Sequence, residues 1–472
     1  MTAARMPVLA WMGSAAASVA LGVGIVANPQ LAFIAIAAFL GASALAAPAG
    51  AWVLCALIAA LAFRGLVELE ALPSVATYVD LPLAWGALAV ALVKNPARPP
   101  FLRRHFLWLA ALGLAVMLAW AFHPSEILRP ILYLALLGEP FAIVGALLAD
   151  PPSPRLRRLL EGALVGLVLI QIPVAALQLA TLGQGDTIQG TLYGAGAGAH
   201  VISGVVIVGA IWFLGGGIAR RVLGPMWLPI VVALFVIPFV ADAKQVIAAT
   251  PVIVLASSWS GGRLGVLLRA ALAAVLVVAL FTLAPAGQTA QEYIERNSGE
   301  QGGKEATLLF VWEKLDDEPA SIAFGRGPAE TVSRAAFETR AGSPLADLGL
   351  KPAPIASEAA RGAREVSGGS TSFDIGISSM IGVLGDLGVI GVAAYGGLLL
   401  SLMLRLRRER SPDGVAAAAG FALFLVLGVV VDWWEQPPFG VFIATLAGLA
   451  LTGAHDRVGV NNRGDDSSSA LV

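Results

Sequence analysis

Long runs of apolar residues, separated by short polar or proline-containing stretches, repeat along most of the chain. A helix needs about 20 apolar residues to cross the hydrocarbon core of a bilayer, so each run is a candidate transmembrane helix. The pattern predicts an all-α polytopic membrane protein with about 14 transmembrane helices. The expected spans lie near residues 8–26, 30–47, 50–63, 78–94, 105–122, 130–149, 160–181, 199–218, 226–241, 245–260, 264–284, 377–403, 414–431 and 438–453.

The composition agrees with a protein that lies in lipid. Hydrophobic residues make up 58% of the chain, charged residues make up 13%, and the mean hydropathy is +0.82. A soluble protein of 472 residues could not bury that apolar fraction, so the lipid bilayer is an expected partner. The net charge of −1 says nothing about other partners, and we expect no nucleic acid among them. The single cysteine, Cys55, excludes an internal disulfide framework.

The positions of lysine and arginine predict how the chain is oriented. The N-terminal apolar run follows Arg5 and is longer than the roughly 7–15 apolar residues of a signal peptide, so we interpret it as a retained first span. If Arg5 is cytoplasmic, the inner connections hold eighteen of the thirty lysines and arginines, as cytoplasmic loops do. The short outer loops hold three of them: Arg64, Arg129 and Lys244. We therefore expect a multi-pass protein of the cytoplasmic (inner) membrane with both termini cytoplasmic.

This orientation divides the chain into four parts. Residues 1–284 hold the first eleven predicted spans, and residues 285–376 form one large extracytoplasmic loop. Residues 377–454 hold the last three spans, and residues 455–472 are expected to form a disordered cytoplasmic tail. The loop contains 23 of the 61 charged residues, and the helical apolar spacing of its residues 305–316 predicts an ordered lid at the membrane interface. The alternative is a solvated linker.

Charged residues interrupt the apolar sequence at Asp242 and Lys244, in the predicted outer hairpin between spans nine and ten. Charge at mid-membrane is costly, so these residues belong near the lipid headgroups. In one interpretation the two residues mark a tight turn and Lys244 reaches to the interface. In the other, Lys244 projects into an outward cavity and binds an anionic lipid headgroup.

Three other segments converge on the same predicted face. The glycine-rich residues 190–204 open a span and contain His200, which is a local helix cap or a functional group. In residues 323–328, Arg326 lies between two glycines, in a turn suited to phosphate. Residues 378–391 bring the long loop back into the membrane.

The order of these segments along the chain resembles that of the motifs in the O-antigen polymerase and O-antigen ligase superfamily of bacterial surface-polysaccharide enzymes. The family carries a Phe-Gly-x-Gly-Pro element, matched by Phe324–Pro328, and then a span that begins Glu-x-Gly-x-x-Gly, matched by Asp386–Gly391. The glycine-rich segment is matched by residues 190–203, and Lys244 stands where the family has arginine. The resemblance covers roughly residues 160–450. The chain differs from ligase-type members of the family because its residues 285–376 contain no histidine.

The resemblance implies a GT-C-like fold and an inverting, metal-independent membrane glycosyltransferase of O-antigen, capsule or exopolysaccharide biosynthesis. Such an enzyme polymerises or ligates polyprenyl-pyrophosphate-linked oligosaccharides at the outer face of the cytoplasmic membrane, with a glycan or lipid-linked acceptor and no cofactor. Preplaced cations would stabilise the pyrophosphate leaving group, so Lys244 and Arg326 are the candidates to bind it. His200 is a possible third donor or proton carrier, and Asp374 or Glu365 is a candidate base.

Two acidic residues lie within predicted spans, where carboxylates are candidates for function. Glu139 precedes Pro140 near the middle of its span, and either couples transport or satisfies backbone groups freed by the proline. Asp386 lies about ten residues into its run, where the first turns of the helix could still be at the interface. The alternatives to a glycosyltransferase are a transporter or flippase of a lipid-linked or polar substrate, and a non-catalytic partner in envelope assembly. Asp432 and Glu435 flank Trp433 and Trp434, and we expect these four residues to belong to an aromatic belt at the membrane interface.

Overall fold

The structure, a computed structural model, describes nine parts of the chain in which every regular element is a helix. The described residues are 47–68, 72, 74–95, 100–192, 198–216, 222–257, 303–339, 350–367 and 378–465.

The helices follow one another through the predicted apolar runs and into the long loop. In chain order they are α3 (Ala49–Ile58), η1 (Ala59–Phe63), α4 (Arg64–Glu68), η2 (Ser74–Tyr78), α5 (Asp80–Lys94), α6 (Pro100–Phe122), α7 (Leu128–Ala149), α8 (Pro154–Leu182), η3 (Gly190–Leu192), α9 (Gly198–Leu214), η4 (Gly224–Met226), α11 (Trp227–Val240), α12 (Lys244–Ser257), α15 (Gly303–Asp316), α16 (Pro319–Phe324), α17 (Arg334–Phe337), α18 (Pro354–Ser367), α19 (Ser379–Leu406), α20 (Pro412–Val430), η7 (Trp433–Glu435) and α21 (Pro437–Asp465).

The helices confirm an all-helical, multi-pass membrane protein. Six of the described helical segments are long and apolar enough to cross a membrane, and four further apolar helices are shorter. Of the fourteen predicted spans, 8–26, 264–284 and all of 30–47 except its last residue fall in parts that are not described, and each of the other eleven coincides with a helix. The total of fourteen and the GT-C-like class remain predictions.

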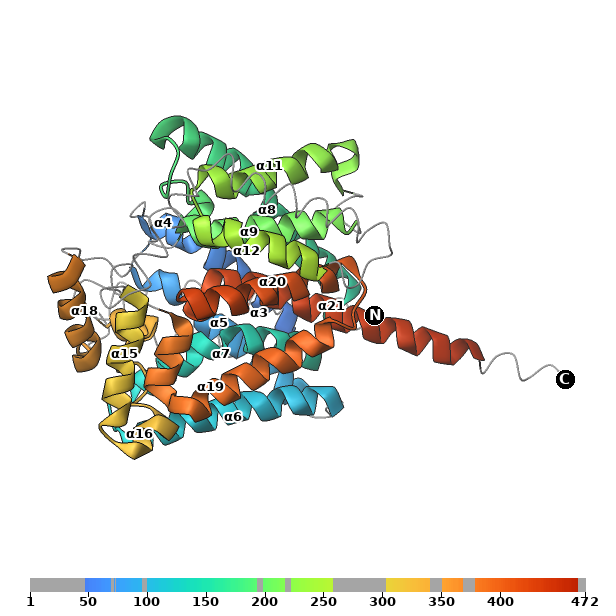
Figure 1. Cartoon of the computed structure of the whole chain (residues 1–472). Helices are drawn as coiled ribbons and strands as arrows, with labels where there is room; N and C mark the ends of the chain where they lie inside the picture. Colours follow the sequence, from blue (N-terminus) through green and yellow to red (C-terminus); the bar gives the residue numbers. More distant parts are fainter. Residues whose placement is uncertain are drawn as a thin grey trace, which may run out of the picture.

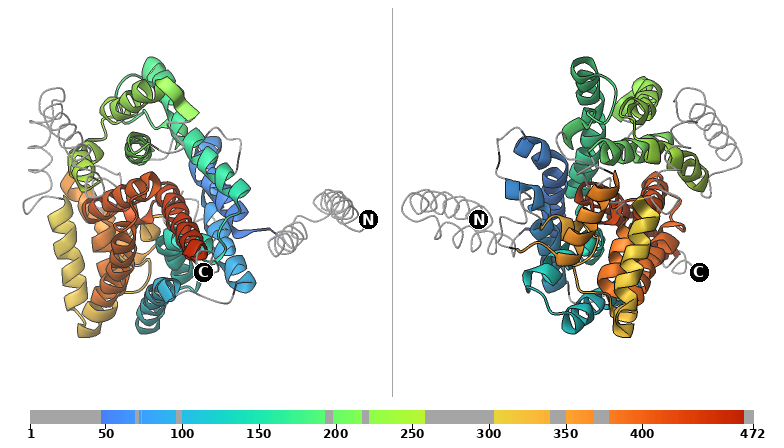
Figure 2. Two further views of the ribbon diagram at one scale, coloured as in Figure 1. Left: turned by 90° about the vertical axis from the view of Figure 1, so that its right-hand side faces the viewer. Right: turned by 60° about the vertical axis from the view of Figure 1, so that its left-hand side comes forward.

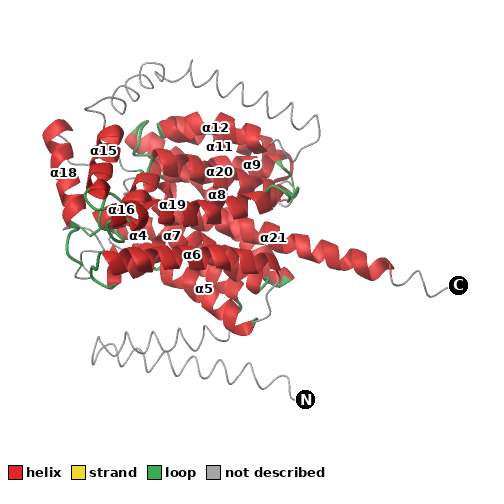
Figure 3. Cartoon of the chain, turned by 60° about the horizontal axis from the view of Figure 1, so that its bottom comes forward, coloured by secondary structure: helices red, strands yellow, loops and turns green. Residues whose placement is uncertain are grey.

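Helix α7 is at the centre of the bundle. It packs against α5, α6 and α21, and 78% of the apolar stretch that could cross the membrane is buried inside the protein. Figure 1 shows α6, α7, α20 and α21 running side by side, with α15, α16 and α18 gathered at one end of the bundle. The last turns of α21 extend from the opposite end, as Figure 3 also shows. Helices of the long loop therefore cover one end of the bundle and the C-terminal helix leaves from the other.

Serine residues start several of the long helices. Ser153, Ser378 and Ser411 precede α8, α19 and α20, and the hydroxyl of each accepts a backbone N–H in the first turn. Proline follows directly in α8 and α20, where its missing N–H costs nothing because the first-turn N–H groups have no helical acceptor. The local sequence thus defines where these helices begin.

Helix α19 bends at Gly388, whose backbone angles are φ 65° and ψ −165°. Only glycine adopts this region without strain, and a side chain here would also collide with the Ala323 carbonyl of α16. Figure 2 shows α15 alongside the first part of α19 in both views. The part after the bend, residues 389–406, is about 27 Å long, which suits a membrane crossing.

Candidate functional site

Successive long helices run in opposite directions, so their ends alternate between the two ends of the bundle. The end of α6 and the start of α7 meet the end of α20 and the starts of α19 and α21 at the end that α15 to α18 cover. Most of the charged side chains discussed below lie there, in three groups that we define by their residues.

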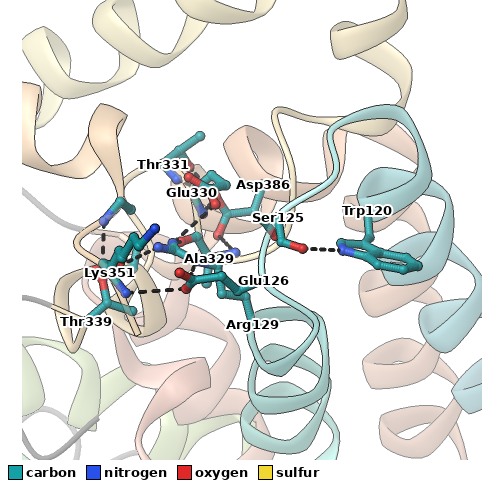
Figure 4. A network of polar contacts seen from close by, with 12 residues as sticks. Trp120, Ser125, Glu126, Arg129, Ala329, Glu330, Thr331, Thr339, Lys351 and Asp386 are labelled. Carbon is teal, nitrogen blue, oxygen red and sulfur yellow. Dashed lines mark hydrogen bonds and ion pairs between the residues drawn. The ribbon is translucent and has the colours of Figure 1, made fainter. Parts of the chain in front are cut away.

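The first group is an anchor built on Asp386 of α19, which is fully buried (Figure 4). Its carboxylate accepts backbone N–H groups from Ala329 at 3.1 Å, Glu330 at 3.2 Å and Thr331 at 2.7 Å. The Thr331 hydroxyl donates a fourth hydrogen bond at 2.6 Å. Ala329 has a positive φ of 57°, which turns these successive N–H groups toward one anion. Asp386 thus holds the long loop on α19, a structural role that the sequence left open.

Arg129, at the start of α7, fastens the same loop from the other side. Arg129 is 3% exposed, and its guanidinium donates to the Ala329 carbonyl at 3.0 Å and to the Lys351 carbonyl and pairs with Glu330 at 3.2 Å. Burial raises the pKa of Glu330 from 4.5 to about 7, and the nearby Asp386 adds to the rise while Arg129 opposes it. The sequence singled out Arg129 only as one of three cations in short outer loops; its role as a clamp is visible only in the structure.

The two glycine motifs of the sequence touch each other. The backbone N–H of Arg326 donates to the Gly385 carbonyl at 2.8 Å, and that of Gly327 donates to the Asp386 carbonyl at 3.2 Å. Gly325, with φ 76°, lies so close to the Asp386 backbone that no side chain would fit. The Phe324–Pro328 turn therefore sits directly on the bend of α19.

The second group surrounds the Arg326 side chain. Its Nη1 lies 3.4 Å from Glu318 Oε2 and 3.4 Å from Ser321 Oγ. His123, just after α6, has Nε2 at 3.1 Å from the same hydroxyl and at 3.7 Å from Glu318. Burial lowers the pKa of His123 below 6.5 and Arg326 lowers it further, whereas Glu318 raises it. A mainly neutral imidazole thus lies beside a guanidinium at the surface of the long loop.

The third group lies at the hairpin between α11 and α12. Asp242 has a positive φ of 50° in this turn, and its Oδ2 lies 3.0 Å from Lys244 Nζ. The two side chains are 45% and 48% exposed. His200, in the first turn of α9, is close enough to Asp242, Lys244 and Asp432 to interact electrostatically with them. His200 and Lys244 therefore lie within electrostatic range of each other.

The aromatic belt predicted for residues 432–435 is wrong. Trp433 and Trp434 are only 2% and 5% exposed, so they pack inside the bundle rather than in the lipid interface. Asp432 instead pairs with Arg334 at 3.1 Å, and buried Glu435 accepts the Ala335 N–H at 2.9 Å. Burial raises the pKa of Glu435 to about 8. These contacts fasten α17 of the long loop to the segment between α20 and α21.

The structure does not bring Lys244 and Arg326 together. Lys244 begins α12, which packs on α9, α11 and α20, whereas Arg326 follows α16, which packs on α6, α15 and α19. In Figure 1, α12 lies in the upper half of the bundle and α16 at its lower edge. A single diphosphate held by both side chains, as the sequence suggested, finds no support in this arrangement.

The other candidates lie apart from these groups or outside the described residues. Glu139 is fully buried in the middle of α7, where the adjacent Pro140 lies against Gly440 of α21. Glu365 lies in α18 and its side chain is not described, and Asp374 lies outside the described residues. Within the described part of the chain, no cluster of three or more His, Cys, Asp or Glu side chains could hold a metal ion.

Among the charged residues at this end of the bundle, the sequence reasoning missed His123, Arg129, Glu318, Glu330 and Arg334 as site residues. They lie in segments without a distinctive motif, and only folding places them beside the motifs. Comparison of the sequence with protein-family models gives no match, and comparison with curated proteins gives no significant one.

Proposed function

We propose that the protein is a membrane glycosyltransferase that polymerises or ligates polyprenyl-pyrophosphate-linked oligosaccharides. The acceptor hydroxyl attacks the anomeric carbon of the donor sugar, a new C–O bond forms, and the bond between that carbon and pyrophosphate breaks. The hydroxyl proton passes to a base, and polyprenyl pyrophosphate leaves with the bonding electrons. Cations placed in advance at the leaving group, which stabilise its developing negative charge, are then the largest contribution that the protein can make to lowering the reaction barrier.

The observation that carries this proposal is the contact between the Phe324–Pro328 turn and the bend at Gly388. Each segment resembles an element of the same enzyme superfamily in its sequence alone, and the two lie about 60 positions apart in the chain. Their glycines allow backbone contacts that no larger residue permits. Direct contact between two motifs of one superfamily supports a shared architecture with that superfamily.

Lys244 is the proposed cation for the donor pyrophosphate. Its side chain is 48% exposed and pairs with that of Asp242, which is 45% exposed, so a diphosphate can replace Asp242 at little cost. His200, within electrostatic range of Lys244, is the proposed further donor. Arg326, in a separate group with His123, is assigned to the second substrate, a lipid-linked acceptor. Glu365 and Asp374 remain the proposed bases for the acceptor hydroxyl.

The test is chain growth by the purified protein in detergent, supplied with lipid-linked oligosaccharide. Lys244→Ala is expected to lower the rate about 10²–10³-fold, as the loss of one preplaced transition-state donor does. Arg326→Ala is expected to raise the acceptor concentration needed for half-maximal rate. Lys314→Ala is the matched control, because this lysine of the long loop pairs with Glu358 on α18 and has no assigned role in the reaction. Normal chain growth in both Lys244→Ala and Arg326→Ala would exclude the assignment.

A transporter or flippase is the second candidate, and the buried Glu139 favours it. A carboxyl at the centre of a membrane helix is a common coupling group in transporters. Chain growth in detergent, where no second compartment exists, would exclude pure transport. If no growth occurs but proteoliposomes translocate a lipid-linked sugar and Glu139→Gln abolishes this, the transporter is the correct function. Inactivity in both assays would favour the remaining alternative, a non-catalytic partner in envelope assembly.

A further inference from the structure

The end of the bundle opposite the long loop carries a surplus of positive charge. Among the described residues between the ends of α5, α7 and α19 and the starts of the helices that follow them, ten are lysine or arginine and four are acidic. Three of the four acidic residues already have partners. Asp150 accepts two hydrogen bonds, and both Glu161 and Asp413 pair with Arg157. Only Glu409 is left to balance the other cations of these described segments.

The surplus includes arginines at the seam between α6 and α19. These two helices pack against each other in opposite directions (Figure 1), so the start of α6 lies at the same end of the bundle as the end of α19. The ring of Trp108 on α6 lies against Gly397 of α19, so closely that a side chain at this glycine would collide with it. This contact fixes which sides of the two helices face each other.

Arg104 and Arg408 continue the two facing sides toward the end of the bundle. Arg104 lies four positions before Trp108 and about 40° from it around α6, and Arg408 lies eleven positions after Gly397 and about 20° from it around α19. The backbone stays helical at Arg407, and the Arg408 N–H still donates to the Arg405 carbonyl at 3.1 Å. The seam therefore ends in one arginine from each helix.

The directions of the two helices bring these arginines toward a common level. Along the helix axes, Arg104 lies about 6 Å from the level of Trp108 and Arg408 about 16 Å from that of Gly397. Helical side chains lean toward the N-terminus of their helix. The lean is away from the membrane at the start of α6 and back toward it at the end of α19, so it reduces the difference in level.

Both arginines are exposed, and neither guanidinium has an ion-pair or hydrogen-bond partner within the described chain. Exposed apolar side chains lie one turn further into the membrane on the same helix surfaces. Leu404 is 50% exposed and precedes Arg408 by four positions, and Leu107 is 69% exposed and follows Arg104 by three. Residues at these spacings are neighbours on a helix surface. Each arginine thus adjoins a side chain that faces lipid.

We infer that the α6–α19 seam binds an anionic phospholipid, with Arg104 and Arg408 on the headgroup phosphate and the acyl chains along Trp108 and Leu404. A guanidinium can donate two parallel hydrogen bonds to a phosphate, and basic sites between membrane helices bind anionic headgroups. The ammonium of a zwitterionic lipid would be repelled by the surplus positive charge. The seam lies at the opposite end of the bundle from Lys244 and Arg326, so the inference does not depend on the proposed glycosyl transfer.

Native mass spectrometry of the detergent-purified protein tests this inference. Delipidated protein is mixed with phosphatidylglycerol, or with phosphatidylethanolamine of the same acyl chains, and the fraction that carries one bound lipid is measured. The test variant combines Arg104→Gln with Arg408→Gln. The matched control combines Arg155→Gln with Arg158→Gln, which removes two exposed charges from the start of α8 at the same end of the bundle.

The unmodified protein and the control are expected to bind phosphatidylglycerol several-fold more than phosphatidylethanolamine, and the test variant should lose this preference. Absence of the preference in the unmodified protein, or its persistence in the test variant, would overturn the inference. An equal loss in the test and control variants would also overturn it, because the attraction would then come from the total charge of this end. No glycan donor or acceptor is present, so the result is separate from that of the chain-growth assay.

A second measurement leaves both arginines in place and so does not depend on the folding of the test variant. A photo-crosslinking amino acid replaces Leu404, whose exposed side chain is the one expected beside the acyl chains. In nanodiscs that contain equal amounts of the two lipids, it should capture phosphatidylglycerol several-fold more than phosphatidylethanolamine. Equal capture of the two lipids, or capture of neither, would contradict a lipid held at this seam.

Discussion

The Asp386 anchor and the Asp242–Lys244 pair belong to the same described end of the bundle, yet they differ in how fully they are enclosed. Asp386 is completely buried and accepts four hydrogen bonds from the loop residues Ala329 to Thr331. Asp242 and Lys244 are about half exposed and pair with each other across a tight turn. A buried acceptor leaves costly unsatisfied donors when it is removed, whereas an exposed ion pair contributes little to stability. The comparison separates residues that hold the loop in place from residues that can exchange their partner for a substrate.

Removal of the anchor carboxylate should have the largest effect. Asp386→Ala leaves three backbone N–H groups and the Thr331 hydroxyl buried without their acceptor, at a cost of about 3 kcal/mol or more. We expect a fall of several degrees in the apparent melting temperature in detergent, and faster proteolysis of the long loop. An unchanged melting temperature together with a protease-resistant loop would show that Asp386 does not anchor it.

The bend of α19 should be the next most sensitive position. Gly388→Ala places a side chain in a backbone region that is nearly exclusive to glycine and against the Ala323 carbonyl, so we expect a loss of about 1–3 kcal/mol. Gly396→Ala is the control in the same helix, because nothing lies within 4 Å of its added carbon. That control should be neutral or slightly stabilising, since alanine favours helix. Equal melting temperatures for the two variants would contradict the importance of the bend.

The anchor also predicts a dependence of stability on pH. The folded pKa of Glu330, about 7, lies above its unfolded value of 4.5, so the folded state binds the proton more tightly. The resulting contribution to the free energy of unfolding is complete below pH 4.5 and is lost as the pH rises to about 7. Glu435, with a pKa of about 8, adds a similar loss that extends to that pH.

Glu330→Gln isolates the Glu330 contribution, because the amide cannot ionise. We expect the melting temperature of the unmodified protein to fall by a few degrees more than that of the variant between pH 5 and pH 7. Melting curves measured at several pH values in one detergent provide the comparison. Parallel curves for the two proteins would show that Glu330 does not titrate in this range.

The smallest effect on stability is expected at the exposed pair. Lys244→Ala should change the free energy of unfolding by about 0.5 kcal/mol or less, because half-exposed ion pairs are screened by water. The same variant should lose most of its chain-growth activity under the proposed function. A loss of stability as large as that of Asp386→Ala would move Lys244 from the substrate-binding group to the structural one.

Some features of the fold can be predicted from the local sequence alone. Ser153 and Ser411 mark helix starts that the structure contains, and residues 305–316 form the predicted helix of the long loop. The turn at Asp242 also lies in the predicted hairpin between α11 and α12. These features depend on neighbouring residues in the chain, so a local pattern is sufficient to predict them.

The candidate site is formed by contacts between segments that lie far apart in the chain, and no local sequence pattern predicts such contacts. Arg129 reaches the Lys351 carbonyl across 222 positions, and Arg334 reaches Asp432 across 98. The predicted binding of one pyrophosphate by both Lys244 and Arg326 finds no support, because their helices pack on different neighbours, although both residues belong to the covered end of the bundle. Sequence topology can assign a residue to one end of a bundle, but it gives no position within that end.

The sequence by itself determined that the chain is helical, apolar and multi-pass, because helix length, hydrophobic runs and caps are properties of contiguous residues. Only the tertiary structure decided that Asp386 is a buried anchor, that Arg129 clamps the long loop and that Lys244 stays half exposed in its pair with Asp242. The physical reason is that burial and hydrogen-bond partners decide what a charge can do, and packing between distant segments sets both.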